Sequence, residues 1–178
     1  MTKWAKVILL VIGILLIGFM QERVKVNINF ILEKSTNIPN FFNLPAEQRI
    51  EVLAPLKKQG NFDYYYSHGN IQFLYTMDLT QLKALKWLIT GISVLVHLLI
   101  NILLLRIFNC PKIHFKMLYF LSAFILMFAL SSQLLGTLLN LSSEFYPITR
   151  GLMGILQTPI LGIIFLMITN FIANGKYK

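Results

Sequence analysis

The segment Thr90–Asn101 reads TGISVLVHLLIN, an apolar run that nevertheless keeps a few polar side chains. These are Thr90, Ser93, His97 and Asn101. Their spacing of three, four and four residues places all of them on one side of an α-helix. Because polar side chains are costly in hydrocarbon, we expect this polar stripe to face other helices rather than lipid.

The composition favours a membrane protein. Hydrophobic residues make up 56% of the 178 residues and charged residues 13%, about half the charged share of a soluble domain. The mean hydropathy is +0.67. We therefore attribute the net charge of +9 to the membrane topology of the chain and to contact with anionic lipid. Runs of Lys and Arg interleaved with aromatics are missing, so nucleic acid is not an expected partner.

Four apolar segments approach the roughly 20 residues that cross a bilayer as a helix. They are Trp4–Met20, Trp87–Leu105, Met117–Leu139 and Gly151–Ala173. We therefore expect an all-α integral membrane protein with four transmembrane helices and an extracytoplasmic segment of about 60 residues between the first two. The expected parts are a signal-anchor helix over 1–20, the extracytoplasmic segment over 21–82 and a three-helix bundle over 83–178. The first segment lacks a small-x-small cleavage site, which favours an uncleaved anchor.

Two local patterns refine the helix boundaries. Asp78 and Gln81 form a capping-box pattern, which predicts that the second helix begins well before its apolar part. Pro159 is expected to kink the fourth segment. A ridge of small residues at Gly154, Thr158 and Gly162 predicts close packing of that segment, within the chain or against a partner.

The outer segment contains three recognisable pieces. VKVNINFILE, residues 24–33, alternates and fits a strand or a continuation of the first helix. A short amphipathic helix is expected from Pro45 to near Pro55, with its apolar side on the bilayer surface or on the helices beneath it. The aromatic piece that follows, residues 61–78, is typical of a segment at headgroup depth.

The distribution of Lys and Arg favours a cytoplasmic N-terminus and C-terminus. With this orientation, the inner segments carry seven cations and no acid. The cations are Lys3, Lys6, Arg106, Lys112, Lys116, Lys176 and Lys178. The outer segments hold the other nine cations and all seven acids, and several of these cations lie near the spans, which weakens the bias. We expect a bacterial inner-membrane protein with N-in/C-in topology.

Candidate binding residues fall in two groups. Those of the outer aromatic piece are Tyr64, Tyr65, Tyr66 and His68. Those of the membrane segments are Ser93, His97, Asn101, Gln133, Gln157 and Thr158. In the favoured topology the second group converges in the outer half of the membrane, either as hydrogen bonds between helices or as a polar pocket.

The residue types required for catalysis or for metal binding are scarce. Cys110 and His114 are four residues apart, but Pro111 interrupts the helix that would bring them together, so we expect a basic turn rather than a catalytic pair. His68 and Asp63 are too few for a metal site. We expect no cofactor, no metal and no catalytic residue.

In layout, the chain resembles the small multi-pass proteins that accompany bacterial exosortases, which are membrane transpeptidase-like enzymes. The resemblance lies in the anchor helix, the outer segment with FDYYYSHGNIQFLYTMD, and QLKALKW leading into three further helices. It implies an accessory role beside a processing enzyme and carries over no functional residue.

We therefore expect a non-catalytic accessory protein that binds or positions a partner membrane protein or a substrate, in contact with lipid and with another membrane protein or a second copy. The alternative is a small intramembrane pocket of a lipid-handling enzyme, or of a channel-forming oligomer, built on the face that carries His97 and Asn101. A third possibility is a lipid-binding surface protein that retains lipid in the outer half of the bundle.

Overall fold

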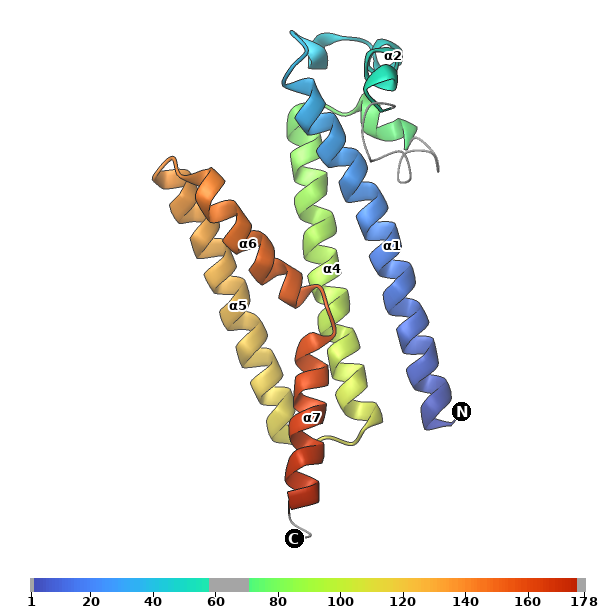
Figure 1. The fold of residues 1–178 in the computed structure, drawn as a ribbon, viewed down its shortest axis with the longest axis vertical. Helices are drawn as coiled ribbons and strands as arrows, with labels where there is room; N and C mark the ends of the chain where they lie inside the picture. Colours follow the sequence, from blue (N-terminus) through green and yellow to red (C-terminus); the bar gives the residue numbers. More distant parts are fainter. Residues whose placement is uncertain (1, 58–70, 176–178) are drawn as a thin grey trace. The chain divides into compact units, whose positions relative to one another are not determined.

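The computed structural model describes residues 2–57 and 71–175, and all regular secondary structure within them is helical (Figure 1). The α-helices are α1 (Lys3–Ser35), α2 (Ala46–Lys57), α4 (Leu79–Ile107), α5 (Lys112–Leu138), α6 (Ser142–Leu156) and α7 (Ile160–Gly175). Two 3-10 turns, η1 (Phe41–Asn43) and η2 (Gln72–Thr76), complete the set. The all-α prediction is confirmed for these residues.

Three of these helices are long and apolar enough to cross a membrane, namely α1, α4 and α5. Helices α6 and α7 pass the same test only as a pair, and they are bent by 56° at a short break. The predicted segment Gly151–Ala173 is therefore interrupted next to Pro159, where a kink was expected, and forms parts of two helices. The break includes Pro159, which lacks the N–H of a helical bond and clashes with the preceding turn.

The chain forms two compact units, each described here on its own. Unit 1 consists of Met1–Ile14 and Ser93–Lys178, and unit 2 of Leu15–Ile92. Unit 1 holds α4 from Ser93 onward and all of α5, α6 and α7, and unit 2 holds the segment expected outside the membrane.

In unit 2, α1 continues as a helix to Ser35, so the helical alternative for residues 24–33 is the observed one. Its 33 residues correspond to about 50 Å, well beyond the bilayer core of about 30 Å. Ile28 and Ile31 are three residues apart on one side of the helix, and both are fully buried. The polar end of α1 is thus stabilised by an apolar core of its own.

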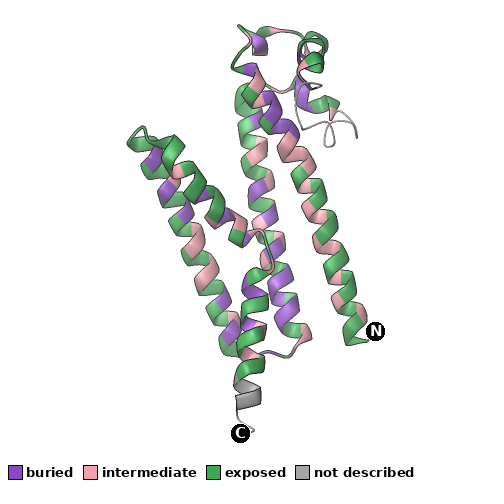
Figure 2. Cartoon of the chain, in the orientation of Figure 1, coloured by how far each residue is buried: buried purple, intermediate pink, exposed green. Residues whose placement is uncertain are grey.

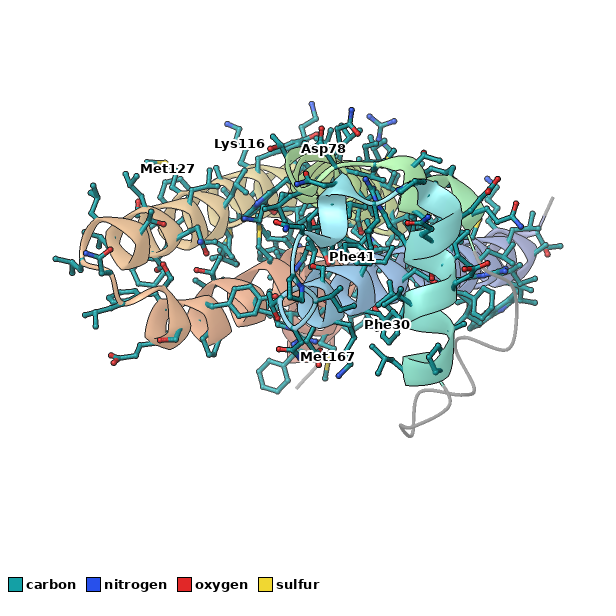
Figure 3. The ribbon with its side chains drawn as sticks, turned by 90° about the horizontal axis from the view of Figure 1, so that it is seen from above. Phe30, Phe41, Asp78, Lys116, Met127 and Met167 are labelled. Carbon is teal, nitrogen blue, oxygen red and sulfur yellow. The ribbon has the colours of Figure 1, made fainter. Side chains whose placement is uncertain are left out.

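That core joins α1 to the segment between α1 and α4. Phe30 and Phe41, labelled in Figure 3, belong to it together with Leu53 and Leu74. Leu53 of α2 is fully buried, so the apolar side of this amphipathic helix packs on unit 2 itself. Helix α2 continues through Pro55 to Lys57, slightly beyond its predicted end.

The start of α4 confirms the predicted capping box. The backbone N–H of Gln81 donates to the Asp78 carboxylate at 2.8 Å, and the Asp78 N–H donates to the Gln81 side chain at 3.0 Å. These reciprocal bonds satisfy two N–H groups at the start of the helix that have no partner within it. Helix α4 therefore begins outside its apolar stretch.

In unit 1, two asparagines end the long helices in the left-handed conformation. Asn109 follows α4 with φ 51°, and Asn140 follows α5 with φ 57°. In both turns the next N–H bonds back to the helix, from Cys110 to Leu105 at 3.0 Å and from Leu141 to Gly136 at 2.9 Å. This Schellman pattern explains the tight reversals after α4 and α5.

Candidate functional site

The polar stripe of α4 is buried. Thr90 is 9% exposed, Ser93 and His97 are each 3% exposed, and Asn101 is 2% exposed. Figure 2 shows buried residues recurring along α4. Thr90 belongs to unit 2, where its hydroxyl donates to the Lys86 carbonyl at 2.8 Å within the helix. The other three side chains belong to unit 1 and form the candidate site.

His97 bonds to its own helix. Its Nδ1 lies 2.8 Å from the backbone carbonyl of Ser93 and 3.4 Å from the Ser93 hydroxyl. A carbonyl oxygen can only accept, so Nδ1 carries a proton and Nε2 is the acceptor of the neutral ring. The bond to the preceding turn fixes the orientation of the ring.

Asn101 connects α4 to the break between α6 and α7. Its Nδ2 donates to the His97 carbonyl at 2.9 Å and to the Thr158 carbonyl at 3.4 Å. Its Oδ1 accepts the backbone N–H of Gly162 at 2.8 Å. Gly162 lies in the first turn of α7, where N–H groups have no partner within the helix. Asn101 therefore satisfies backbone groups on both sides of the break.

Gly162 allows this close approach. A Cβ at this position would lie 2.6 Å from the Asn101 Oδ1 and 3.2 Å from a Leu104 methyl carbon. Gly154, by contrast, has nothing within 4 Å of an added Cβ. The break separates the two glycines into different helices, so the predicted ridge of small residues is not one continuous surface.

The other predicted residues that the structure describes are Thr158, Gln133 and Gln157. Thr158 takes part through its carbonyl, while its hydroxyl donates to the Ile155 carbonyl at 2.9 Å. Gln133 and Gln157 are half-buried on α5 and just after α6. The candidates Tyr64, Tyr65, Tyr66 and His68 lie outside the described residues.

A second polar cluster, which the sequence did not predict, joins α7 to the turn after α4. The Thr169 hydroxyl lies 2.9 Å from Nδ1 of His114 and 3.8 Å from the sulfur of Cys110. It also donates to the Phe165 carbonyl at 2.8 Å, and the Phe165 ring stacks on His114. The expectation that Pro111 keeps Cys110 and His114 apart is therefore wrong, since both reach the same hydroxyl.

This cluster has the geometry of a structural contact between helices. Cys110 is 8% exposed and His114 is 6% exposed, so neither side chain is open to a substrate. Thr169 is one of the few polar residues in the apolar helix α7, and the sequence alone does not indicate which residues it contacts. Its partners come from a turn more than 50 residues earlier in the chain.

Unit 2 contains a buried cation that the sequence analysis also missed. Arg49 is 9% exposed, and its guanidinium donates to the carbonyl oxygens of Leu44 and Phe42, and to those of Tyr75 and Met77 at 2.9 Å each. Four backbone carbonyls therefore surround the charge. Arg49 ties η1, α2 and η2 together.

No metal centre forms within residues 2–57 and 71–175, where no three His, Cys, Asp or Glu side chains group together. Comparison with known proteins adds no assignment: no protein-family model, no curated protein and no solved structure matches the chain. A functional proposal therefore has to be based on the helices and side chains of the chain itself.

Proposed function

We propose that this chain is a four-span membrane protein without catalytic activity that binds and positions a partner membrane protein or its substrate. The three long apolar helices, with the bent α6–α7 pair as the fourth span, support this assignment. The partner can also be a second copy of this chain.

The observation that carries the proposal is the exposure of α1. None of residues 2–26 is buried, although the helix is apolar enough to span a membrane. Leu15 and Met20, for example, are 67% and 68% exposed. In a bilayer such a helix is covered by lipid or by another apolar helix, and it is therefore available for association.

The bonding of the polar stripe supports this role over the pocket alternative. Asn101 uses both amide protons and its oxygen on backbone groups, and the Nδ1 proton of His97 is directed at the Ser93 carbonyl. These side chains stabilise the helices, which leaves little bonding capacity for a ligand.

The favoured orientation, in a bacterial inner membrane, places both termini in the cytoplasm. In unit 1, the Lys3 ammonium lies 4.2 Å from the centre of the Phe108 ring, and Thr169 of α7 contacts the same turn region through His114. The start of α1 and the part of α7 around Thr169 thus approach the basic turn over 106–116, which supports a common side for the two termini.

The resemblance in layout to exosortase-associated proteins makes a membrane-bound processing enzyme the first partner to test. Unit 2 is the part that such a partner would meet outside the membrane, because it has a buried core and exposes apolar residues such as Phe73, which is 52% exposed.

Partner recovery after mild detergent purification tests the proposal. Replacing Leu15, Leu16 and Phe19 with Ala keeps α1 apolar but removes its bulk, and should reduce recovery of the partner. A matched variant replaces Phe124, Met127 and Phe128 of α5, which are similarly exposed, and should retain the partner. Two differently tagged copies identify self-association.

A second variant, measured in the same way, tests the outer segment. Replacing Tyr64, Tyr65 and Tyr66 with Ala should weaken recovery while the protein still inserts. Normal recovery in both the α1 and the tyrosine variants contradicts the proposal.

The pocket alternative has its own test because His97 Nε2 remains a potential acceptor. His97→Leu should leave partner recovery intact under the accessory proposal. Loss of a ligand or of an activity with the fold preserved would instead favour the pocket.

A further inference from the structure

The packing of α5 and α7 leaves a groove of about 490 Å³ on unit 1. This volume falls within the range of roughly 300–1,000 Å³ that is common for small-molecule sites. Its walls include Lys116, Phe120 and Leu121 of α5, and Leu161, Ile164 and Phe165 of α7. Every wall residue except Lys116 is apolar.

The charged residue lies at one end of the groove. Thr169 of α7 bonds His114 of α5, so the later turns of α7 lie beside the first turns of α5 and the two helices are antiparallel. Ile168 is therefore near the end that carries Lys116, and Leu161 lies deeper. From Leu161 to Ile168 the groove runs about 10 Å along α7, roughly a third of the hydrocarbon core.

The surroundings of Lys116, an exposed residue labelled in Figure 3, are cationic. Arg106 lies in the last turn of α4 and Lys112 begins α5, and the Lys3 ammonium contacts the Phe108 ring in the turn between them. Within the described part of unit 1 the one acid is Glu144, in α6. Lys116 and the end of α5 that precedes α6 are separated by about 30 Å of helix. Among the described residues of unit 1, no acidic side chain is therefore close enough to neutralise this end.

We propose that this groove binds an anionic phospholipid, with one acyl chain between α5 and α7 and its phosphate at Lys116. An apolar channel and a cation at its membrane-surface end match the two halves of such a lipid. The lipid would cover Phe120, which is 75% exposed, and Ile164, which is 44% exposed. This inference rests on the membrane-spanning character proposed above.

The headgroup part is tested by measuring lipid retention on the detergent-purified full chain by native mass spectrometry. We expect phosphatidylglycerol to bind about fivefold more tightly than phosphatidylcholine, the worth of one cation near a membrane surface. Lys116→Gln should abolish this preference and Lys116→Arg should keep it. Lys83→Gln removes the same charge outside the groove and should change nothing.

The acyl-chain part is tested with two neighbouring residues of α7. Ile164→Trp fills the groove and should lower retention of both lipids at least fivefold. Ile163→Trp is the matched control, because Ile163 is 45% exposed and does not line the groove. Glycerol 3-phosphate, the soluble headgroup, should not compete with phosphatidylglycerol.

Three results would overturn the lipid site: an unchanged preference in Lys116→Gln, unchanged retention in Ile164→Trp, or effective competition by glycerol 3-phosphate. Resistance of the wild type to alkaline carbonate extraction tests the membrane assignment separately. A chain that stays in the membrane but shows no lipid preference loses only the lipid site, whereas a chain that carbonate releases loses the proposed function.

Discussion

The Oδ1 of Asn101 accepts the backbone N–H of Gly162 at 2.8 Å, 61 residues further along the chain. With the bond from Nδ2 to the Thr158 carbonyl, one side chain of α4 therefore holds both edges of the break between α6 and α7. In hydrocarbon such a break needs partners for its freed backbone groups, because water is absent. Asn101, a polar residue in the apolar run Thr90–Asn101, thus has a defined structural role.

Replacing Asn101 should loosen this break. Asn101→Ala leaves the Gly162 N–H without its acceptor, and we expect a loss of about 1–2 kcal/mol of stability in detergent. The labelling rate of the buried thiol of Cys110 reports the opening of unit 1. Asn170→Ala removes an exposed amide from α7 and serves as the control. Equal labelling rates in both variants would contradict the role given to Asn101.

The two glycines on either side of the break should respond differently to Ala. In Gly162→Ala the new Cβ meets the Asn101 Oδ1 at 2.6 Å, so we expect a cost of roughly 1–3 kcal/mol from overpacking. Gly154 has open space around it, and Gly154→Ala should be neutral or slightly stabilising because Ala favours helix. The midpoints of thermal unfolding in detergent measure both, and a larger loss in Gly154→Ala would contradict this packing.

The sequence predicted features that depend on neighbours along the chain. The capping box of Asp78 and Gln81 and the burial of His97 and Asn101 follow from spacing alone, and both are observed. The bend at Pro159 was expected only as a kink. The bend of 56° and the bonds from Asn101 of α4 that accompany it are not encoded by any local pattern.

Contacts between distant segments were the features that sequence could not provide. No local pattern marks Arg49 of α2 as a buried cation, and its carbonyl partners Tyr75 and Met77 lie 26 and 28 residues away. The partners of Thr169 are similarly distant. A polar residue in an apolar helix indicates that its side chain needs a hydrogen-bond partner, but only the packing of the helices determines which residue that partner is.

Arg49 should be essential for unit 2. Its guanidinium donates to four carbonyls, and a hydrogen bond to a charged group contributes roughly 1.5–3 kcal/mol. We expect Arg49→Met to lose at least about 3 kcal/mol, and Arg49→Lys to recover only part of it because Lys lacks the planar fork. Hydrogen exchange of residues 36–57 measures the effect. Lys34→Met, at an exposed ion pair with Glu33, should have little influence.

The backbone conformation of Asn140, in the turn after α5, should favour glycine at this position. Asn140 adopts φ 57°, a conformation that costs most L-residues roughly 1–2 kcal/mol and costs glycine nothing. Asn140→Gly should therefore preserve or raise the thermal midpoint, whereas Asn140→Val should lower it. The two variants control for each other, since both remove the same side-chain amide, and equal midpoints would count against this turn geometry.

Unit 2 should become less stable at high pH because of Tyr75. The side chain is 1% exposed, and burial raises the pKa of Tyr75 from 10.0 to about 12. Between these values the unfolded chain loses the phenol proton while the folded chain keeps it, so stability is full below pH 10 and falls as pH rises toward 12. We expect hydrogen exchange in unit 2 to accelerate from about pH 9 to about pH 11.5 beyond its intrinsic increase. Tyr75→Phe should remove part of this dependence on pH. Tyr119→Phe, at an exposed residue, should leave it unchanged. Identical pH profiles in the two variants would mean that Tyr75 ionises as readily in the folded chain as in the unfolded one.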